Sequence, residues 1–466
     1  MAESQRRRLR IPPIAAEEED EPVTPMGRMF VKPELNITIH FIIGVENDID
    51  VGALKASVQT AILTKHTRFS SLLVCHGRKQ YWRKTEVDID RHVIIVNLPP
   101  SEDTEITLNQ YVADLTMSPP LSRDKPPWEI HLIPVHRSVV LRIHHALGDM
   151  ISLMSLLFAT SNTAENNLPA TELLKTQKIR SFPKKKKGLR LLGDLRSALF
   201  SLRFCSDILL KASCLSDHRT AIWGGEKAQW MHKKLVTAKF LMADINVVKT
   251  AVPDSTINDV LLGTISAGIS KYLDHHLEKR QKLKITGLSA TNLRKPSGVL
   301  ELSEMMNGNP TSRWGNVVGM ILVPMQREKI NHPLDHLRKI KDIIDKKKQS
   351  KESSFLFTLG KLLFVSSEDV PSGFKKLRCN TTFTVSNVMG PEEKIKILEN
   401  PIKFIRFCST GSYQALSLHF LTYDGKAEMQ IQVAEDVIHD PELLAKCFEI
   451  SLFEMKQEAV ANMGLM

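Results

Sequence analysis

A run of aliphatic and β-branched residues that ends in two adjacent histidines constrains the fold more than any other part of the chain. Residues 139–143 read Val-Val-Leu-Arg-Ile and lead into His144 and His145, and Asp149 follows the second histidine by four positions. Beyond Met150 the apolar residues crowd together at helical spacing, so the pattern predicts a strand that passes directly into a helix. The end of a rigid strand is a place where a cleft can reach a side chain.

The two histidines and the aspartate point to acid–base chemistry. Successive side chains of a strand point to opposite faces, so only one histidine can face a given cleft. We assign His145 to the cleft as a general base, because an ordinary histidine titrates near neutral pH. We assign His144 to support, and Asp149 to holding the local structure through the backbone or a nearby arginine. Two histidines on opposite faces cannot bind one ion together, so no metal site is expected.

Length and charge restrict the architecture and the class of partner. A chain of 466 residues exceeds what one core usually holds, so we expect two domains of about 200 residues each. The formal net charge of +11 suits nucleic acid, an anionic membrane or an anionic phosphorylated substrate. Aromatic residues make up only 6% and do not alternate with arginines, so we expect no nucleic-acid partner.

Several motifs that would indicate other chemistry are missing from the sequence. It contains no Gly-x-Ser-x-Gly motif and no glycine-rich phosphate loop, which argues against a serine hydrolase and a nucleotide-phosphate site of that kind. The six cysteines lie far apart with no Cys-x-x-Cys pair, so neither a disulfide framework nor a zinc site is expected. A reducing compartment fits this pattern.

Shifts in composition divide the chain into four parts. Residues 1–22 are basic, then proline-rich, then acidic, and we expect a disordered tail without a signal peptide. Residues 23–180 form the first predicted domain and residues 226–466 the second. Between them, residues 181–225 include four lysines at 184–187 and continue as a basic amphipathic helix. Charges interrupt that helix throughout, so it does not suit a membrane span. It could lie on an anionic membrane surface or cross between the domains in solvent.

Both predicted domains alternate strands with helices, which indicates an α/β fold with no short repeat. In the first domain, Trp128 opens a strand that could pair with the run before His144, as a core anchor or as a substrate contact. In the second, Ser255 or Thr256 has the character of a helix N-cap. Further strands are predicted at residues 35–43, 283–290, 316–324 and 382–391, a hairpin at 415–433 and a last helix at 441–458.

In their order along the chain, these motifs resemble the bifunctional wax ester synthase/diacylglycerol acyltransferase family in its plant form. The histidine stretch is similar to that family's His-His-x-x-x-Asp-Gly motif, and residues 120–129 are similar to its Pro-Leu-(x)n-Pro-x-Trp-Glu segment. Residues 258–259 resemble its Asn-Asp helix start, and residues 387–391 its Asn-x-x-Gly-Pro segment. Residues 21–27 are also like the plant members, so the resemblance covers nearly all of the chain beyond the tail.

The resemblance implies a fold and a reaction. The fold would be the two-domain CoA-dependent acyltransferase fold, similar to chloramphenicol acetyltransferase, with mixed sheets, flanking helices and a tunnel between the domains. The reaction would transfer a fatty acyl group from acyl-CoA, as co-substrate and without a cofactor, to a long-chain fatty alcohol or to diacylglycerol. His145 would take the hydroxyl proton. We expect association with a membrane surface at the cytosolic face of the endoplasmic reticulum, or at the plasma membrane.

The same resemblance suggests roles for residues outside the histidine stretch. Trp128, Asn258 and Asn387 are candidates for substrate binding, and Asn258 could also help to stabilise the tetrahedral charge. Arg294, at a predicted strand end in the second half, is our candidate partner for Asp149. Asp259 and Gly390 are assigned to structural support along with Arg294.

The chain departs from the family motif at Met150, where the motif has glycine. Glycine permits a tight turn or a close backbone approach that a Cβ atom would hinder. The methionine side chain could narrow the cleft, tilt His145 or have little effect. Two alternatives therefore stay open: an acyltransferase that uses another alcohol acceptor, and a catalytically impaired lipid-binding paralogue.

Overall fold

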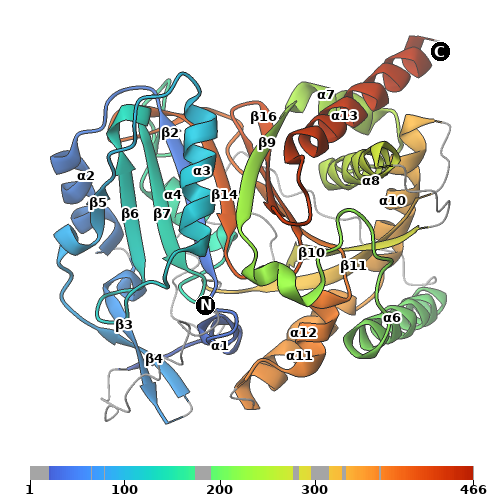
Figure 1. Ribbon diagram of the computed structural model, residues 1–466, viewed down its shortest axis with the longest axis horizontal. Coiled ribbons are helices and arrows are strands. Elements are labelled where there is room, and N and C mark those ends of the chain that lie inside the picture. The colour runs from blue at the N-terminus through green and yellow to red at the C-terminus, as the bar shows by residue number, and fades with distance from the viewer. Residues whose placement is uncertain are drawn as a thin grey trace.

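The computed structural model describes residues 20–63, 66–77, 79–173, 190–276, 283–294, 314–327, 332–366 and 369–464. Most of the predicted tail and the lysine run at 184–187 lie outside these residues. The described chain forms two large sheets that lie side by side, each covered by helices, and one smaller sheet (Figure 1). Within the described residues, no helix combines the length and the apolar composition that crossing a bilayer requires.

The first large sheet has seven strands in the order β5-β6-β7-β2-β14-β13-β8. Its centre is antiparallel: β7 pairs on one side with β6 (Trp128↔Ile143) and on the other with β2 (Thr38↔His144). Only the β5–β6 pair is parallel in the first four strands. The strands span β2 Thr38–Val45, β5 Val93–Ile95, β6 Trp128–Ile133, β7 Ser138–His144, β8 Asn162–Thr163, β13 Ile395–Ile397 and β14 Asn400–Ser409.

The second large sheet has six strands in the order β11-β10-β12-β15-β16-β9. The β10–β12 and β12–β15 pairs are parallel, and the other pairs are antiparallel, so this sheet is also mixed. The predicted hairpin is present as β15 and β16, joined at residues 424–425. The strands span β9 Lys233–Leu241, β10 Leu283–Asn292, β11 Val318–Arg327, β12 Phe383–Met389, β15 Leu416–Tyr423 and β16 Lys426–Ala434.

The second half of the chain contributes two strands, β13 and β14, to the first sheet. β14 pairs antiparallel with β2 over Ile402–Ser409, with Phe407 opposite Phe41. The sequence did not predict that these two strands join the first sheet. Their addition places a turn from the second half, at residues 398–399, beside the first sheet. A separate, smaller sheet consists of β1 (Glu21–Pro22), β4 (Lys79–Lys84) and β3 (Ser71–His76).

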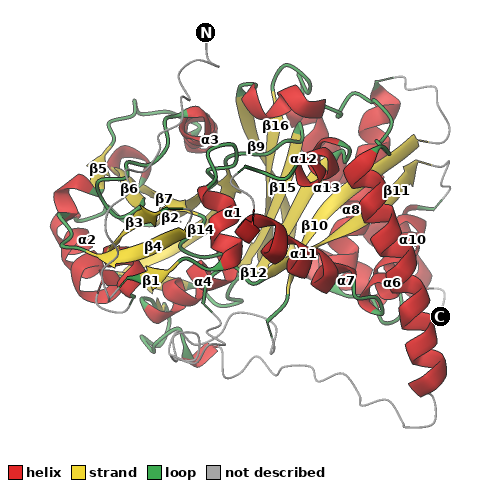
Figure 2. Cartoon of the chain, turned by 90° about the horizontal axis from the view of Figure 1, so that it is seen from below, coloured by secondary structure: helices red, strands yellow, loops and turns green. Residues whose placement is uncertain are grey.

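Helices cover each face of the first sheet and the outer face of the second (Figures 1 and 2). α4 and α2, which continues as a π-helix, cover one face of the first sheet, and α3 lies on its other face towards β9. α8, α10 and α13 pack on the second sheet. The helices span α1 Pro25–Val31, α2 Val51–Ser57, the π-helix Val58–Leu63, α3 Thr104–Met117, α4 Met150–Ala159, α6 Arg190–Ser213, α7 Met242–Thr250, α8 Ile257–His275, α10 Pro333–Lys348, α11 Glu352–Ser366, α12 Ser372–Cys379 and α13 Pro441–Gly464.

The pleat of β7 decides which side each histidine faces. Val139, Leu141 and Ile143 belong to the apolar core beneath α4, whereas Val140 packs with residues of α3 on the opposite face. Because side chains alternate along a strand, His144 lies on the α3 face and His145 continues the α4 face. The two histidines therefore serve different sides of the sheet.

Candidate active site

A short loop between β7 and α4 carries the candidate catalytic residues. The strand ends at His144, and α4 begins at Met150 with Asp149 as its N-cap. The Asp149 Oδ1 atom accepts the backbone N–H of Ser152 at 3.0 Å. This bond satisfies one of the free donors at the start of the helix. The predicted transition from strand to helix at the histidines is confirmed.

Asn316 fixes the protonation pattern of the His145 ring. Its Nδ2 atom donates to the backbone carbonyl of His145 at 2.9 Å, and its Oδ1 atom lies 2.9 Å from the ring Nδ1 atom. A carbonyl oxygen can only accept, so the amide nitrogen must face it and the amide oxygen must face the ring. The ring nitrogen Nδ1 therefore carries the proton and donates it to Asn316. This tautomer leaves Nε2 as the basic nitrogen.

The surroundings of His145 keep it neutral. Burial lowers the pKa of His145 below its ordinary value, and the charge of Asp149 and the bond to Asn316 only partly oppose this effect. The ring also stacks on Phe30 of α1, with the centroids 3.9 Å apart and the planes inclined by 17°. A neutral, clamped imidazole whose Nε2 atom has no hydrogen-bond partner among the described residues is suited to accept a proton at neutral pH.

His144 is held in the opposite tautomer and has both ring nitrogens occupied. Its Nδ1 atom accepts the backbone N–H of Ala146 at 3.2 Å, so Nε2 carries the proton and donates to Asn36 Oδ1 at 3.1 Å. Burial, with smaller contributions from the neighbouring His145 and Arg123, lowers the pKa of His144 to about 3. His144 is thus a neutral residue that shapes the loop, which fits the supporting role predicted for it.

Asp149 forms a buried, bidentate ion pair with Arg294. The arginine Nη1 atom lies 2.8 Å from Oδ2, and its Nη2 atom donates to Oδ1 at 2.9 Å. Both side chains are almost completely buried. The contact predicted between these two residues is therefore present, across 145 positions of sequence. It holds the loop against the end of β10 and leaves no carboxylate oxygen for a substrate, since Oδ2 also accepts the Val317 backbone N–H at 3.0 Å.

A segment before β11 completes the site from the second half of the chain. The Trp314 indole donates to the backbone carbonyl of Leu147 at 2.8 Å, and the Gly315 carbonyl accepts from Arg294 at 2.8 Å and from Ser152 at 3.1 Å. Gly315 has a φ of +108°, which favours glycine. Sequence reasoning missed Asn316 and Trp314. A Trp-Gly-Asn triplet directly before a predicted strand was the available signal.

The predicted substrate-binding residues do not all gather at the histidines. Trp128 is buried, donates from its indole to the Phe69 carbonyl at 2.8 Å and stacks on His92, yet one side of it lines an apolar cavity. Asn387 and Asn258 lie 3.5 Å apart between side-chain amide atoms. No hydrogen bond in the described part of the chain joins either asparagine to His145. Their roles in binding stay predictions.

The residues assigned to structural support occupy positions that suit that role. Asp259 forms a capping box with Thr256 at the start of α8, as the predicted N-cap requires. Gly390 donates its N–H to the Thr422 carbonyl at 2.9 Å, and a Cβ atom there would lie only 2.2 Å from that oxygen. Gly390 thus permits a close approach of two backbones at the end of β12.

Met150 does not occupy a position that requires glycine. It is the first residue of α4, its backbone is helical and its side chain is buried in the core of the first sheet. It lines neither of the two cavities described below. With Met150 at this position, His145 still forms its hydrogen bonds with Asn316 and its ring contact with Phe30.

A polar cavity of about 440 Å³ lies between the two halves on the His144 side of β7. Residues of both halves line it, including Arg123, Arg142 and Lys233, which give it a positive character. Burial lowers the pKa of Lys233 to about 8. Two buried polar atoms of the lining, Nε of Arg142 and Oε1 of Gln432, have no partner among the described residues. Buried polar groups of this kind call for a water molecule or a ligand.

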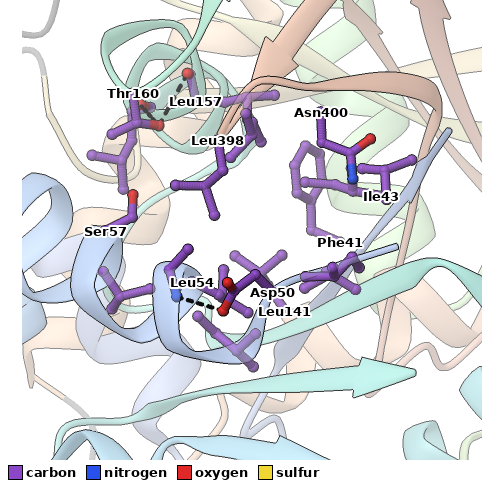
Figure 3. Close-up of a pocket in the computed structure, with 18 of the residues that line it drawn as sticks. Phe41, Ile43, Asp50, Leu54, Ser57, Leu141, Leu157, Thr160, Leu398 and Asn400 are labelled. Atoms are coloured by element: carbon purple, nitrogen blue, oxygen red, sulfur yellow. Dashed lines mark hydrogen bonds between the residues drawn. The ribbon is translucent and has the colours of Figure 1, made fainter. Parts of the chain in front are cut away.

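A second, apolar cavity of about 280 Å³ lies on the His145 side of the sheet, beneath α4 (Figure 3). Its floor consists of alternate residues of β6, β7 and β2, and its roof of residues from α2, the π-helix and α4. The turn at residues 398–399 borders it as well. The two cavities thus occupy opposite faces of one strand that ends in the two histidines.

Comparison with known proteins identifies the family of the chain. The family model described as "Wax ester synthase/diacylglycerol acyltransferase catalytic domain" matches residues 54–261, and that described as "WS/DGAT C-terminal domain" matches residues 314–456. Wax ester synthase/diacylglycerol acyltransferase 5 of Arabidopsis thaliana is 32% identical over 482 residues, covering 94% of this chain and 94% of the relative. Wax ester synthase/diacylglycerol acyltransferase 11 of the same plant is also 32% identical, covering 96% of each chain.

Solved structures confirm the predicted two-domain fold. The wax ester synthase/diacylglycerol acyltransferase from Marinobacter aquaeolei VT8 superimposes with a TM-score of 0.59 at 16% identity, covering 94% of this chain and 99% of that one. The starter condensation domain of rhizomide synthetase, solved in complex with C8-CoA, has a TM-score of 0.55 at 12% identity and covers 95% of both chains. By sequence relationship over almost its full length, the chain belongs to the wax ester synthase/diacylglycerol acyltransferase family.

Proposed function

We propose that the protein transfers a fatty acyl group from acyl-CoA to a long-chain alcohol or to diacylglycerol, with His145 as the general base. The observation that carries the proposal is the amide of Asn316, which binds both the carbonyl and the Nδ1 atom of His145 and leaves Nε2 unprotonated. Acyl transfer to an alcohol needs such a base, because a hydroxyl group is a weak nucleophile. The names of the relatives point to the same two products.

The reaction proceeds in two proton transfers. Nε2 of His145 takes the hydroxyl proton of the acceptor as its oxygen forms a bond to the thioester carbonyl carbon. The tetrahedral intermediate then collapses, the carbon–sulfur bond breaks, and the leaving thiolate takes the proton from the imidazolium. A positioned base of this kind contributes about 10²- to 10⁴-fold to the rate. The thioester is already activated, so the reaction needs no further cofactor.

The positive cavity between the halves suits the polar arm of acyl-CoA. Arg123 and Lys233 supply positive charge for phosphate groups, whereas the charge of Arg142 is paired with Glu129, and the unpartnered Gln432 oxygen can accept from an amide of the pantetheine arm. His144 lies in the wall of this cavity. A donor whose arm occupies it would bring its thioester to the end of β7, where His145 lies.

The outer face of α6 supports association with a membrane surface. Leu199, Leu202 and Leu209 are each more than half exposed, and they lie on one stripe of the helix. Arg196 and Arg203 are exposed beside the stripe. An apolar stripe next to basic residues suits an anionic bilayer, the phase in which the acceptors dissolve. We extend the proposal to the cytosolic face of the endoplasmic reticulum or the plasma membrane.

Purified protein should be incubated with palmitoyl-CoA and either hexadecanol or dipalmitoylglycerol, and the lipid products separated. We expect wax ester, triacylglycerol or both, and loss of the product in His145→Ala. Absence of both esters, or a full rate in His145→Ala, would overturn the proposal. For the membrane, flotation with phosphatidylserine vesicles should fall in Leu202→Glu, while Ile106→Glu, a change at an exposed residue of α3, serves as the control. Cell fractionation of the tagged protein tests the location.

A further inference from the structure

The apolar cavity beneath α4 is built to exclude polar groups. Strands β6, β7 and β2 contribute Trp128, Leu141 and Phe41 to its floor, and the roof consists mainly of aliphatic residues. Several polar side chains at its border have partners: Thr160 donates to the Leu156 carbonyl at 3.0 Å, Asp50 caps α2, and Glu129 pairs with Arg142. No side-chain atom of this lining is buried without a partner among the described residues, in contrast to the cavity on the other face. Such a cavity recognises hydrocarbon.

The strand register gives the cavity a direction. Ile143, Leu141 and Val139 follow one another along its floor, and His145 is the next position on the same face beyond Ile143. The strand extends about 13 Å from Ile143 to Val139, and about 7 Å separate Ile143 from His145 on its other side. The resulting path of about 20 Å is comparable to one leaflet of a bilayer, about 15 Å, and hence to one fatty chain.

The far end of the cavity lies at the turn between β13 and β14. Leu398 and Glu399 form this two-residue turn, with φ values of +52° and +59°. Both residues line the cavity, and Leu398 is labelled above its centre in Figure 3. Two consecutive residues of this type rarely adopt the left-handed conformation, so the surrounding structure holds the turn in a defined shape. Leu398 therefore presents a fixed apolar wall to whatever occupies the cavity.

We propose that this cavity holds the hydrocarbon chain of the acyl donor, extending from the thioester near His145 towards the turn at Leu398. The proposal rests on the proposed acyltransferase function. A cavity of about 280 Å³ is roughly twice the size of one that admits benzene, so it has room for about a dozen carbons of a single chain. The acyl donor always brings one chain to the reaction, whereas diacylglycerol brings two chains and a glycerol unit.

Charge also favours the donor chain and sets its direction. Asp48, Asp50 and Glu399 border this cavity, and no lysine or arginine lines it, although Asp48 pairs with Arg137 and Glu399 with Lys396 outside the lining. The phosphates of CoA would meet no cation in this lining, whereas the cavity on the other face offers Arg123 and Lys233. The donor thus passes around the end of β7, with its polar arm on the His144 side and its chain on the His145 side. The occupied length of the chain then depends on the residues of the floor and the turn.

Two substitutions to tryptophan test this arrangement, one in the middle of the floor (Leu141→Trp) and one at the far end (Leu398→Trp). Leu141→Trp should lower kcat/KM for palmitoyl-CoA relative to octanoyl-CoA by at least about tenfold, since missing pocket space for even one methylene is worth about that much. Leu398→Trp should affect stearoyl-CoA most. The preference among octanol, dodecanol and hexadecanol should not change. Ile106→Trp, on exposed α3 outside the cavity, is the matched control.

A binding measurement separates this proposal from the acyltransferase proposal. Palmitoyl-CoA that carries bromine in its chain should quench the fluorescence of Trp128, and Trp128→Phe should remove that part of the quenching. Quenching without any ester product would overturn the acyltransferase function but would still support binding of the acyl chain in this cavity. Ester formation without quenching, or a Leu141→Trp variant that changes the alcohol preference and not the acyl preference, would overturn the chain assignment.

Discussion

Replacing Asn316 by alanine tests whether His145 acts through a fixed tautomer. The substitution removes two hydrogen bonds of 2.9 Å, one to the carbonyl and one to the ring of His145. A hydrogen bond of this kind contributes about 1 kcal/mol net, and its loss removes a preference of similar size for the tautomer with a free Nε2 atom. With the added freedom of the ring, we expect kcat to fall by about 10- to 100-fold.

The assay is the rate of wax ester formation from palmitoyl-CoA and hexadecanol between pH 5 and 9, as kcat and KM. KM should change little, because Asn316 positions the base and lines neither substrate cavity. The neutral form of His145 is the active one, so kcat/KM should rise with pH through its pKa and then stay flat. Burial lowers this pKa, so the rise should fall below pH 6.5.

A second variant makes the test specific for the ring of His145. In Asn316→Asp a carboxylate replaces the amide, favours the imidazolium and raises the pKa, so the rise in kcat/KM should move to higher pH. A merely structural role for Asn316 would not produce that shift. Asn162→Ala, at an amide that bonds only to Asn167 at the surface, is the control for the change in side chain. An Asn316→Ala rate within about threefold of the natural protein, with an unmoved profile in Asn316→Asp, would refute the reasoning.

Three further outcomes follow from buried groups around the site. Arg294→Ala leaves the Asp149 carboxylate buried without its partner and should lower the free energy of unfolding by about 3–5 kcal/mol in urea melts, and adding Asp149→Ala should recover part of that loss. Met150→Gly removes a buried side chain and should lower the free energy of unfolding by about 2–5 kcal/mol, while the folded variant retains its kcat. A large fall in kcat would show that the side chain takes part in catalysis. His40 and His144 have pKa values of about 3 in the folded protein, so the unfolded chain binds more protons below pH 6.5. The free energy of unfolding should therefore decrease as the pH is lowered, by about 2 kcal/mol for each histidine at pH 5. A melting temperature that is constant from pH 7 to 5 would contradict this.

Local patterns in the sequence were sufficient for the elements that form the histidine loop. The apolar run before His144 predicts β7, and the crowding after Met150 predicts α4, because each pattern extends over a single element. Thr256 was recognisable as an N-cap for the same reason. The pairing of Asp149 with Arg294 was also predictable, since a buried carboxylate needs a cation and a strand end in the second half offered one.

Contacts between distant segments were not accessible in the same way. Asn316 lies 171 positions from His145, and although the Trp-Gly-Asn triplet marks it, no local pattern indicates which residue it binds. The addition of β13 and β14 to the first sheet depends on which sheet edge is free after folding, and the pattern of a single strand does not show which sheet it joins. The change from α2 to a π-helix at Val58 was not predictable either, because a helical pattern does not distinguish the two hydrogen-bonding schemes.

The dependence of the base on the second half of the chain has a consequence for how activity arises. His145 belongs to the first half, yet its tautomer is set by Asn316, and its loop is held through Asp149 by Arg294 and Val317. The first sheet itself is complete only when β14 pairs with β2 and the turn at Leu398 closes the apolar cavity. A folded first half alone would therefore have the histidine pair without an oriented base and the cavity without its far wall. In the proposed reaction, proton acceptance by His145 and binding of the acyl chain would therefore both require the second half of the chain to be in place.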